Sequence, residues 1–223
     1  MKVIAIANQK GGTGKTTIAL ALAAKLGLID GHRVQLIDLD FLQKSAYTWN
    51  QHAEGKYFDV VPLPASALAN HVKRNASSHD YFIVDCPPRA DEDASKIINA
   101  SDYILVPVQP SPYDVWASGG LIELITAKRA LTAGIPGMPK EGTPRAGLML
   151  SCVIKNTRIA REVHEVMRET GIPVLAAHTT QFDTYKRAAL EGKTLFDCKE
   201  KNAEAIAQIN ALADEITRGL HDD

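Results

Sequence analysis

The 223-residue sequence has few cysteines, no long apolar run and almost no net charge, and each absence excludes a class of protein. Its three cysteines, Cys86, Cys152 and Cys198, are scattered, which argues against a disulfide framework or a cysteine metal site. No apolar stretch approaches the roughly 18 residues needed to span a bilayer. Lys and Arg total 25 and Asp and Glu total 26, a net charge of −1, so any attraction to nucleic acid requires a local patch. We expect a soluble, cytoplasmic protein without a signal peptide.

Short β-branched runs alternate with helical patterns along the whole chain. Most runs are apolar on both faces, as strands buried between two helical layers are. The expected strands are 2–7, 34–39, 58–61, 81–85, 103–108, 146–153 and 173–178. The expected helices are 16–26, 66–75, 92–99, 115–133, 158–170, 184–191 and 203–220. The alternation predicts one α/β domain over 1–223, a doubly wound, mostly parallel sheet with helices on both faces and its ligand at the carboxyl ends of the strands.

The most informative stretch is NQKGGTGKTT, residues 8–17, directly after the first apolar run. In a strand-to-helix loop of this kind, backbone amides cradle a phosphate, a lysine neutralises its charge and a hydroxyl ligates Mg²⁺. The residues expected to contact the nucleotide are Gly11, Gly12, Thr13, Gly14, Lys15, Thr16 and Thr17, with Thr16 on the metal. The spacing is unusual because Gln9 stands where the first glycine is expected and a second lysine, Lys10, follows. The alternative is a glycine-rich turn without a ligand.

The segment KGGTGKTT resembles the deviant Walker A loop, K-G-G-x-G-K-[ST], of the ParA/MinD family of P-loop ATPases. The resemblance covers essentially the whole chain and is nearest to the small stand-alone plasmid-partition ATPases of the ParA type. It implies ATP and Mg²⁺ as ligands and a homodimer that clamps two ATP molecules face to face. Lys10 would then reach the partner's phosphates, where a desolvated, charge-assisted contact is strong. The alternative for Lys10 is a solvated loop lysine.

Two carboxylates follow the second expected strand. Asp38 and Asp40 are two residues apart, so they share one face at the carboxyl end of that strand. The corresponding family segment reads V-D-x-D-P-Q, and by this resemblance Asp38 would lie near the Mg²⁺ shell while Asp40 positions the attacking water. Phe41 and Leu42 stand in place of the usual proline and glutamine. The alternative is a pair of carboxylates that cap the next element.

A third carboxylate, Asp85, ends the apolar run YFIVD. A rigid, dry strand that delivers an acid towards Mg²⁺ is what a P-loop ATPase requires. Pro87 and Pro88 follow and resemble the D-x-P-P switch of the family; two prolines stiffen a loop that moves when the γ-phosphate is lost. No strong general base is readable, so the expected activity is slow ATP hydrolysis that a partner stimulates.

The segment PVQPSPYD, residues 107–114, resembles the P-V-x-P-S-x-x-D segment of small partition ATPases. The resemblance implies that Pro110 lies beside the nucleotide at the dimer interface and that Asp114 holds Lys10 at rest. Asp114 could instead be an ordinary N-cap of a helix that begins at Val115. By the same resemblance, Asn156 would contact the adenine edge, with a simple turn asparagine as the alternative.

Basic residues gather in the second half of the chain. The resemblance implies non-specific, salt-dependent DNA binding, for which the candidates are Lys155, Arg158, Lys186 and Arg187. Acidic residues are interleaved among them, and a solvated helix face explains the pattern about as well.

The function implied by the resemblance is ATP-dependent DNA partition. An ATP-bound dimer would bind nucleoid DNA and be released when a ParB-type adaptor stimulates hydrolysis, so that a plasmid is positioned. One alternative is the same switch with a protein cargo, such as a carboxysome or chemoreceptor cluster; another is an ATP-dependent metabolic ligase. The last helix carries an apolar stripe at Ile206, Ile209, Leu212 and Ile216 but few basic residues, so we expect a docking helix and no membrane partner. An N-terminal helix-turn-helix extension is not expected either.

Overall fold

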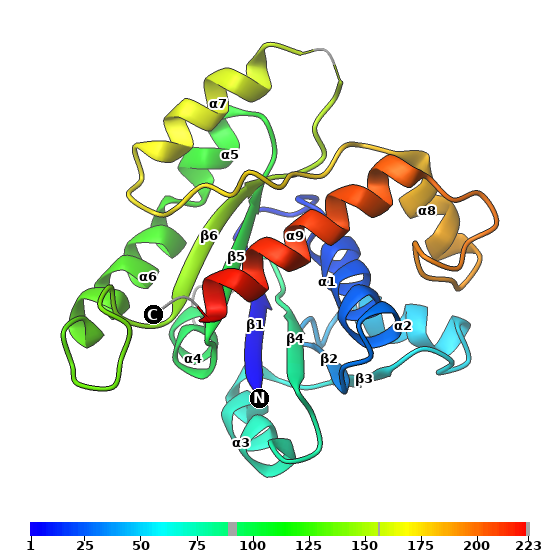
Figure 1. Cartoon of the computed structure of the whole chain (residues 1–223), viewed down its shortest axis with the longest axis horizontal. Coiled ribbons are helices and arrows are strands. Elements are labelled where there is room, and N and C mark those ends of the chain that lie inside the picture. The colour runs from blue at the N-terminus through cyan, green and yellow to red at the C-terminus, as the bar shows by residue number, and fades with distance from the viewer. Residues whose placement is uncertain (89–92, 156, 222–223) are drawn as a thin grey trace.

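A computed structural model describes residues 1–88, 93–155 and 157–221 and contains a six-stranded parallel sheet with helices on both faces (Figure 1). The strand order is β3-β2-β4-β1-β5-β6. The strands are β1 (Lys2–Ile6), β2 (Val34–Asp38), β3 (Asp59–Pro62), β4 (Tyr81–Asp85), β5 (Tyr103–Val108) and β6 (Arg145–Leu150). The central strands are buried along their length, which explains why their sequences are apolar on both faces. The predicted fold class is confirmed.

The helices cover the two faces of the sheet around two apolar clusters. One cluster includes buried side chains of α1 (Lys15–Ala24), α2 (Ser45–His52) and α9 (Ala203–His221). The other includes side chains of α3 (Ala65–Asn75), α4 (Ala94–Ala100), α6 (Gly119–Thr132) and α7 (Ile159–Arg168). Two further helices, α5 (Pro112–Ala117) and α8 (Asp183–Leu190), lie towards the carboxyl edge of the sheet (Figure 1).

The stripe expected on the last helix is buried. Ile209, Leu212 and Ile216 are each fully buried, and Ile206 packs against the same cluster. Figure 1 shows α9 lying across the sheet next to α1. Throughout the described ranges, every helix is too short or too polar to serve as a bilayer span.

The expected seventh strand at 173–178 is wrong. The segment makes only an isolated bridge, in which Val174 pairs with Leu148 of β6. The reason is that the backbone N–H groups of Ala176 and Ala177 donate to the carboxylate of Glu215 on α9, at 3.0 and 2.9 Å, and so leave the sheet. A side chain from a distant helix therefore ends the pairing, which strand propensity could not show.

Two helix predictions also differ from the structure. The expected helix 115–133 is divided into α5 and α6 at Ser118, whose hydroxyl donates to the carbonyl of Asp114 at 2.8 Å. Such a bond back to the preceding turn competes with continuation of the helix, and two glycines follow directly. The helix α2 was not expected at all, because its polar sequence has no clear apolar period. It forms because Trp49 and Ala46 pack into the core.

Candidate functional site

The predicted site residues lie at one edge of the sheet, where the carboxyl ends of the central strands meet. The loop after β1 leads into α1, and the segments after β2, β4 and β5 surround it. Asp38 and Asp85 are register partners at the ends of β2 and β4. Parallel strands thus bring together residues that are far apart in the sequence, at the edge where α/β proteins bind their ligands.

The loop between β1 and α1 has the backbone conformation of a phosphate cradle. Gly12 and Gly14 have φ values of 79° and 84°, which a residue with a Cβ adopts only under strain. A Cβ added at Gly11 or Gly12 would meet nothing within 4 Å, so the loop faces open space. The hydroxyl of Thr13 is buried without a hydrogen-bond partner among the described residues. These features leave room and donors for an anion at the N-terminus of α1.

Lys15 is the first residue of α1 and is only 7% exposed. Its Nζ donates to the carbonyl of Lys10 at 2.8 Å and thereby spans the loop. Burial lowers the pKa of Lys15, while the nearby carboxylate of Asp85 acts in the opposite direction. A lysine in this setting gains from an additional negative charge, such as a phosphate, placed against the loop.

Asp85 has the environment of a metal-binding acid. It is 2% exposed, and its Oδ1 has no hydrogen-bond partner in the described part of the chain. Burial raises the pKa of Asp85 to about 7, although the side chains of Thr16 and Lys15 act to lower it. A cation beside this carboxyl would satisfy the unpaired oxygen and favour the ionised form.

The residues present fit Mg²⁺. The side chain of Thr16 lies near enough to Asp85 to lower the pKa of that carboxyl, so a hydroxyl and a carboxylate already lie together. Over the described ranges, no group of three His, Cys, Asp or Glu side chains forms a metal site of its own. Mg²⁺ commonly takes one or two protein oxygens and completes its shell with water and substrate phosphates, which agrees with this small donor set.

Asp38 and Asp40 bind backbone N–H groups of the loop that follows them. The two carboxylate oxygens of Asp38 accept from Asp40 and Tyr47, each at 3.0 Å, and Oδ1 of Asp40 accepts from Gln43 at 3.0 Å. Asp38 is fully buried, and burial raises its pKa. In this structure Asp38 binds the first turn of α2, as the capping alternative describes, whereas Asp40 binds the turn that precedes the helix. Asp40, which is partly exposed, is the one with access to solvent.

Lys10 and Asp114 form an ion pair of 2.9 Å, so the contact expected between them is present. The side chain of Asp114 is 4% exposed and that of Lys10 is 41% exposed. The N-cap alternative for Asp114 is wrong, because α5 begins at Pro112 after Ser111 and Asp114 lies within its first turn. A negative charge there interacts favourably with the helix dipole.

Two buried polar residues that sequence reasoning missed hold this pair. The amide nitrogen of Asn8 donates to Ser118 at 3.0 Å and to the carbonyl of Pro107 at 2.8 Å. The oxygen of Asn8 accepts from the backbone N–H of Lys10 at 3.0 Å. Ser118 in turn donates to the backbone of Asp114. The network connects the loop after β1 to α5, and no sequence pattern links residues 110 positions apart.

The remaining predicted residues of this edge lie around the loop. Pro87 and Pro88 follow Asp85 and are partly exposed. Pro110 is partly exposed as well and lines a cleft beside the phosphate loop. Asn156 lies outside the described residues, so its expected base contact stays a prediction.

The cleft beside the phosphate loop has a volume of about 490 Å³, within the range of small-molecule sites. Gly12, Gly14 and Thr17, from the loop and the first turn of α1, are among its lining residues. Apolar side chains form much of the rest: Ile18, Cys152, Ile154, Phe182 and Tyr185. An apolar slot adjoining a phosphate cradle suits the base and sugar of a nucleotide.

Residues 179–182 are a segment of this cleft that the sequence did not indicate. The backbone N–H of Val153 donates to Thr179, and that of Gln181 donates to Val153. These two bonds hold a loop against the end of β6. The sequence predicted a strand as far as residue 153, but β6 ends at Leu150. In the sequence, the only indication of this loop is the polar run that follows residue 178.

Three of the four candidate DNA-binding residues are paired with acids of the same chain. Lys155 contacts Glu204 at 2.5 Å, Arg187 contacts Glu200 at 2.6 Å, and Lys186 lies 3.9 Å from Asp183. These ion pairs are exposed, so they contribute little to the stability of the fold, and the basic side chains can leave them for another anionic partner at little cost. Arg158 immediately precedes α7 and is exposed. DNA binding by these four residues stays a prediction.

The family of the chain follows from its sequence as well as its fold. Residues 4–196 match the family described as the CobQ/CobB/MinD/ParA nucleotide binding domain. The chain belongs to this family. The match includes the phosphate loop, Asp38, Asp40, Asp85 and the cleft, so the expected ParA/MinD resemblance is confirmed.

Two similar relatives are carboxysome distribution proteins. The chain is 30% identical over 216 residues to maintenance of carboxysome distribution protein A from Halothiobacillus neapolitanus, covering 96% of this chain and 95% of the relative. It is 33% identical over 220 residues to the protein of the same name from Gloeobacter kilaueensis, covering 97% and 94%. The solved ATP complex of Cyanothece McdA has the same fold, with a TM-score of 0.74, 18% identity and coverage of 100% and 97%.

Proposed function

We propose that this family member is an ATP-driven switch that positions a protein assembly, such as a carboxysome, within the cell. The observation that carries the proposal is the end-to-end similarity to two carboxysome distribution proteins, at 30% and 33% identity. This similarity favours a protein cargo over the plasmid cargo that the sequence motifs first indicated. A metabolic ligase has no comparable support.

In this proposal the edge of the sheet binds ATP with Mg²⁺. Lys15 and the amides of the loop hold the phosphates, and Thr16 and Asp85 hold the metal, which neutralises charge on the phosphoryl group. The cleft at Ile154 and Phe182 takes the base. Asp40 orients the attacking water, because it is the carboxylate of the β2 pair that reaches solvent. Asp38 keeps Asp40 in place through its bond to the Asp40 backbone.

Lys10 couples nucleotide binding to dimerisation in this proposal. At rest it is held by Asp114, and in the dimer it exchanges this partner for the phosphates in the second subunit. The exchange leaves Asp114 buried without its cation, which costs free energy. The more highly charged triphosphate offsets that cost better than a diphosphate does, so the dimer forms with ATP and dissociates after hydrolysis.

The first test measures the molar mass of the protein by light scattering coupled to size-exclusion chromatography. It is done in three conditions: with ATP and Mg²⁺, with ADP and Mg²⁺, and without nucleotide. We expect a dimer with ATP alone, and a monomer under all conditions for Lys10→Ala. Lys73→Ala is the matched control, since Lys73 is an exposed lysine on α3. A Lys10→Ala chain that dimerises as the unmodified protein does would remove the basis of the switch.

The cargo is tested by deleting the gene in its host. Clustering of a protein assembly with unchanged plasmid retention supports the proposal. Plasmid loss with correctly placed assemblies would instead favour DNA partition, for which the segment 107–114 is the specific argument. In either case the ATP-bound dimer is expected to bind random-sequence DNA and a stimulating adaptor, and turnover that requires a small-molecule acceptor would indicate a ligase.

A further inference from the structure

A second cleft lies at the opposite edge of the sheet from the phosphate loop, and the proposed switch does not use it. Its volume is about 460 Å³. Tyr103 is the first residue of β5 and Arg145 the first residue of β6, and both line the cleft. Since β5 ends at Val108, beside the nucleotide edge, the two clefts lie at opposite ends of the same strand.

The walls of this second cleft are strongly basic. Four cationic side chains, Arg129, Lys140, Arg145 and Arg218, line it together with two acidic ones, Glu141 and Glu215. The lining therefore carries an excess of two positive charges, whereas the whole chain has a net charge of −1. A basic concavity of this kind concentrates anions.

Both acids are already engaged by the protein. Glu141 accepts from the guanidinium of Arg129 at 2.7 Å. Glu215 accepts from two backbone N–H groups, as described above for the segment after β6. Lys140 and Arg218 are exposed and form no ion pair with any residue that the structure describes. These two cations have charge available for a ligand.

Tyr103 contributes a hydroxyl group to the lining of the cleft. Tyr103 is 3% exposed, and its Oη makes no hydrogen bond within the described part of the chain. Gly147 leaves space for it, because a Cβ at that position would lie 2.5 Å from the hydroxyl oxygen. Burial and the carboxylate of Glu215 raise the pKa of Tyr103, with Arg129 and Arg145 acting in the opposite direction. The hydroxyl is therefore a neutral group that lies near Glu215 as well as near the two arginines.

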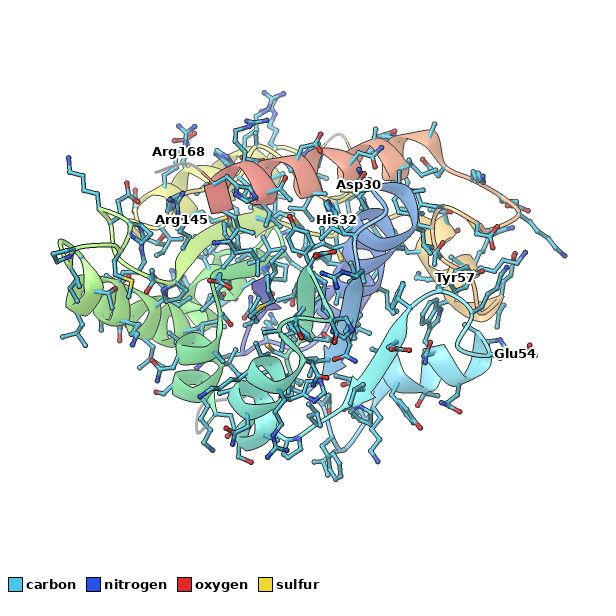
Figure 2. The ribbon with its side chains drawn as sticks, turned by 60° about the horizontal axis from the view of Figure 1, so that its bottom comes forward. Asp30, His32, Glu54, Tyr57, Arg145 and Arg168 are labelled. Atoms are coloured by element: carbon cyan, nitrogen blue, oxygen red, sulfur yellow. The ribbon has the colours of Figure 1, made fainter. Side chains whose placement is uncertain are left out.

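Arg129 provides an unsatisfied donor, since its Nε is buried without a partner among the described residues. A neighbouring hollow of about 460 Å³ shares Arg129 and Glu141 and adds Arg168. Figure 2 shows Arg145 and Arg168 on the same side of the molecule, beside the carboxyl-terminal part of α9. The basic surface thus continues beyond the rim of the cleft.

We propose that this cleft binds a small anion that carries two or more phosphate groups. Guanidinium groups present pairs of N–H donors that match phosphate oxygens. Several such groups converge here with the Tyr103 hydroxyl, and the volume suits a ligand larger than a single phosphate. The proposal is independent of the cargo and of the dimer.

The test uses pyrophosphate as the probe, in Mg²⁺-free buffer and with Lys15→Ala in every chain, so that binding at the phosphate loop is suppressed. Calorimetric titration is expected to give one site per chain. Adding Arg218→Gln or Tyr103→Phe should weaken binding about tenfold. Adding Arg74→Gln, a matched change of an exposed arginine on α3, should leave it unchanged.

Three outcomes would overturn the proposal. The first is no binding of pyrophosphate to the Lys15→Ala chain. The second is an equal loss with Arg74→Gln, which would indicate diffuse charge rather than a site. The third is citrate binding as tightly as pyrophosphate, which would show that the cleft does not select phosphate. If Tyr103→Phe failed to fold, Arg218→Gln would still decide the question, because Arg218 is exposed and changes no buried contact.

Discussion

The ion pair of Lys10 and Asp114 leads to a demanding prediction, because its two members are buried to different extents. The Asp114 side chain is 4% exposed and its Oδ1 has no described hydrogen-bond partner, whereas the Lys10 side chain is 41% exposed. Lys10→Met therefore leaves a buried carboxylate without its cation. Breaking a fully buried pair in this way costs about 3–5 kcal/mol. Water that enters at the half-exposed Lys10 position offsets part of the cost, so we expect a loss of about 1–3 kcal/mol.

Asp114→Asn is expected to be much milder. The variant loses a partly screened ion pair and a charge in the first turn of α5, together about 1 kcal/mol. It also removes the cost of burying a charge, so the net change in the free energy of unfolding should stay within about 1 kcal/mol. In the double variant the missing lysine no longer matters, because the amide needs no counter-ion. The expected coupling energy is about 1–2 kcal/mol.

The assay is urea unfolding of the four nucleotide-free chains, followed by the fluorescence of the buried Trp49. Losses that simply add, or a larger loss for Asp114→Asn than for Lys10→Met, would refute the reasoning. The same coupling predicts a gain of function. Freed from its resting partner, Lys10 in Asp114→Asn should tighten the ATP-dependent dimer about 5- to 30-fold, measured by sedimentation.

Three further predictions concern stability. The pKa of Asp85 is raised to about 7 from an ordinary 3.8, so the ligand-free native state holds a proton that the unfolded chain has released. The free energy of unfolding therefore falls as the pH rises from about 4 to 7. Thermal unfolding at pH 5.5 and pH 8 should show this dependence, and Asp85→Asn should remove most of it. Asp38→Ala leaves two backbone N–H groups without their acceptor and should cost about 1–3 kcal/mol in urea unfolding. Gly147→Ala places a Cβ 2.5 Å from the Tyr103 hydroxyl and should also cost about 1–3 kcal/mol, while Gly119→Ala, which meets nothing within 4 Å, should change stability by at most about 1 kcal/mol. Equal effects of the two glycine changes would contradict the packing argument.

The sheet and the phosphate loop were predictable because their signals are local. Apolar runs such as that of β4 are buried on both faces, and the glycines before Lys15 adopt the conformations that only glycine adopts easily. The errors arose where distant groups decide the structure. The segment 173–178 leaves the sheet because Glu215 takes its N–H groups, and α2 forms because Trp49 is buried. Neither cause can be read from a local pattern.

The sequence indicated which residues gather at this edge and one contact among them, that of Lys10 with Asp114, but it did not indicate the other contacts. Spacing alone indicates that Asp38 and Asp40 share a face, yet it cannot show that both bind backbone N–H groups of the loop that follows. Asn8 and Ser118 hold Lys10 and Asp114 together without belonging to any recognisable motif. The role of these two residues can be recognised only in the folded structure, in which β1 and β5 lie side by side.

The unsatisfied groups of the nucleotide edge support an account of why this edge is built at a cost to stability. Thr13 Oγ1, Asp85 Oδ1 and Asp114 Oδ1 are buried without partners among the described residues. Each such group lowers the stability of the ligand-free chain by about 1–3 kcal/mol. In the proposed switch, the hydroxyl in the phosphate loop and the acid beside Mg²⁺ gain their missing partners when nucleotide and metal bind, so that cost becomes binding free energy. Asp114 differs, because in the same proposal it gains no partner from the nucleotide and loses Lys10 in the dimer. The two proposed steps therefore act on different groups: nucleotide and metal satisfy Asp85, whereas dimerisation leaves Asp114 unpaired until hydrolysis lets the dimer dissociate.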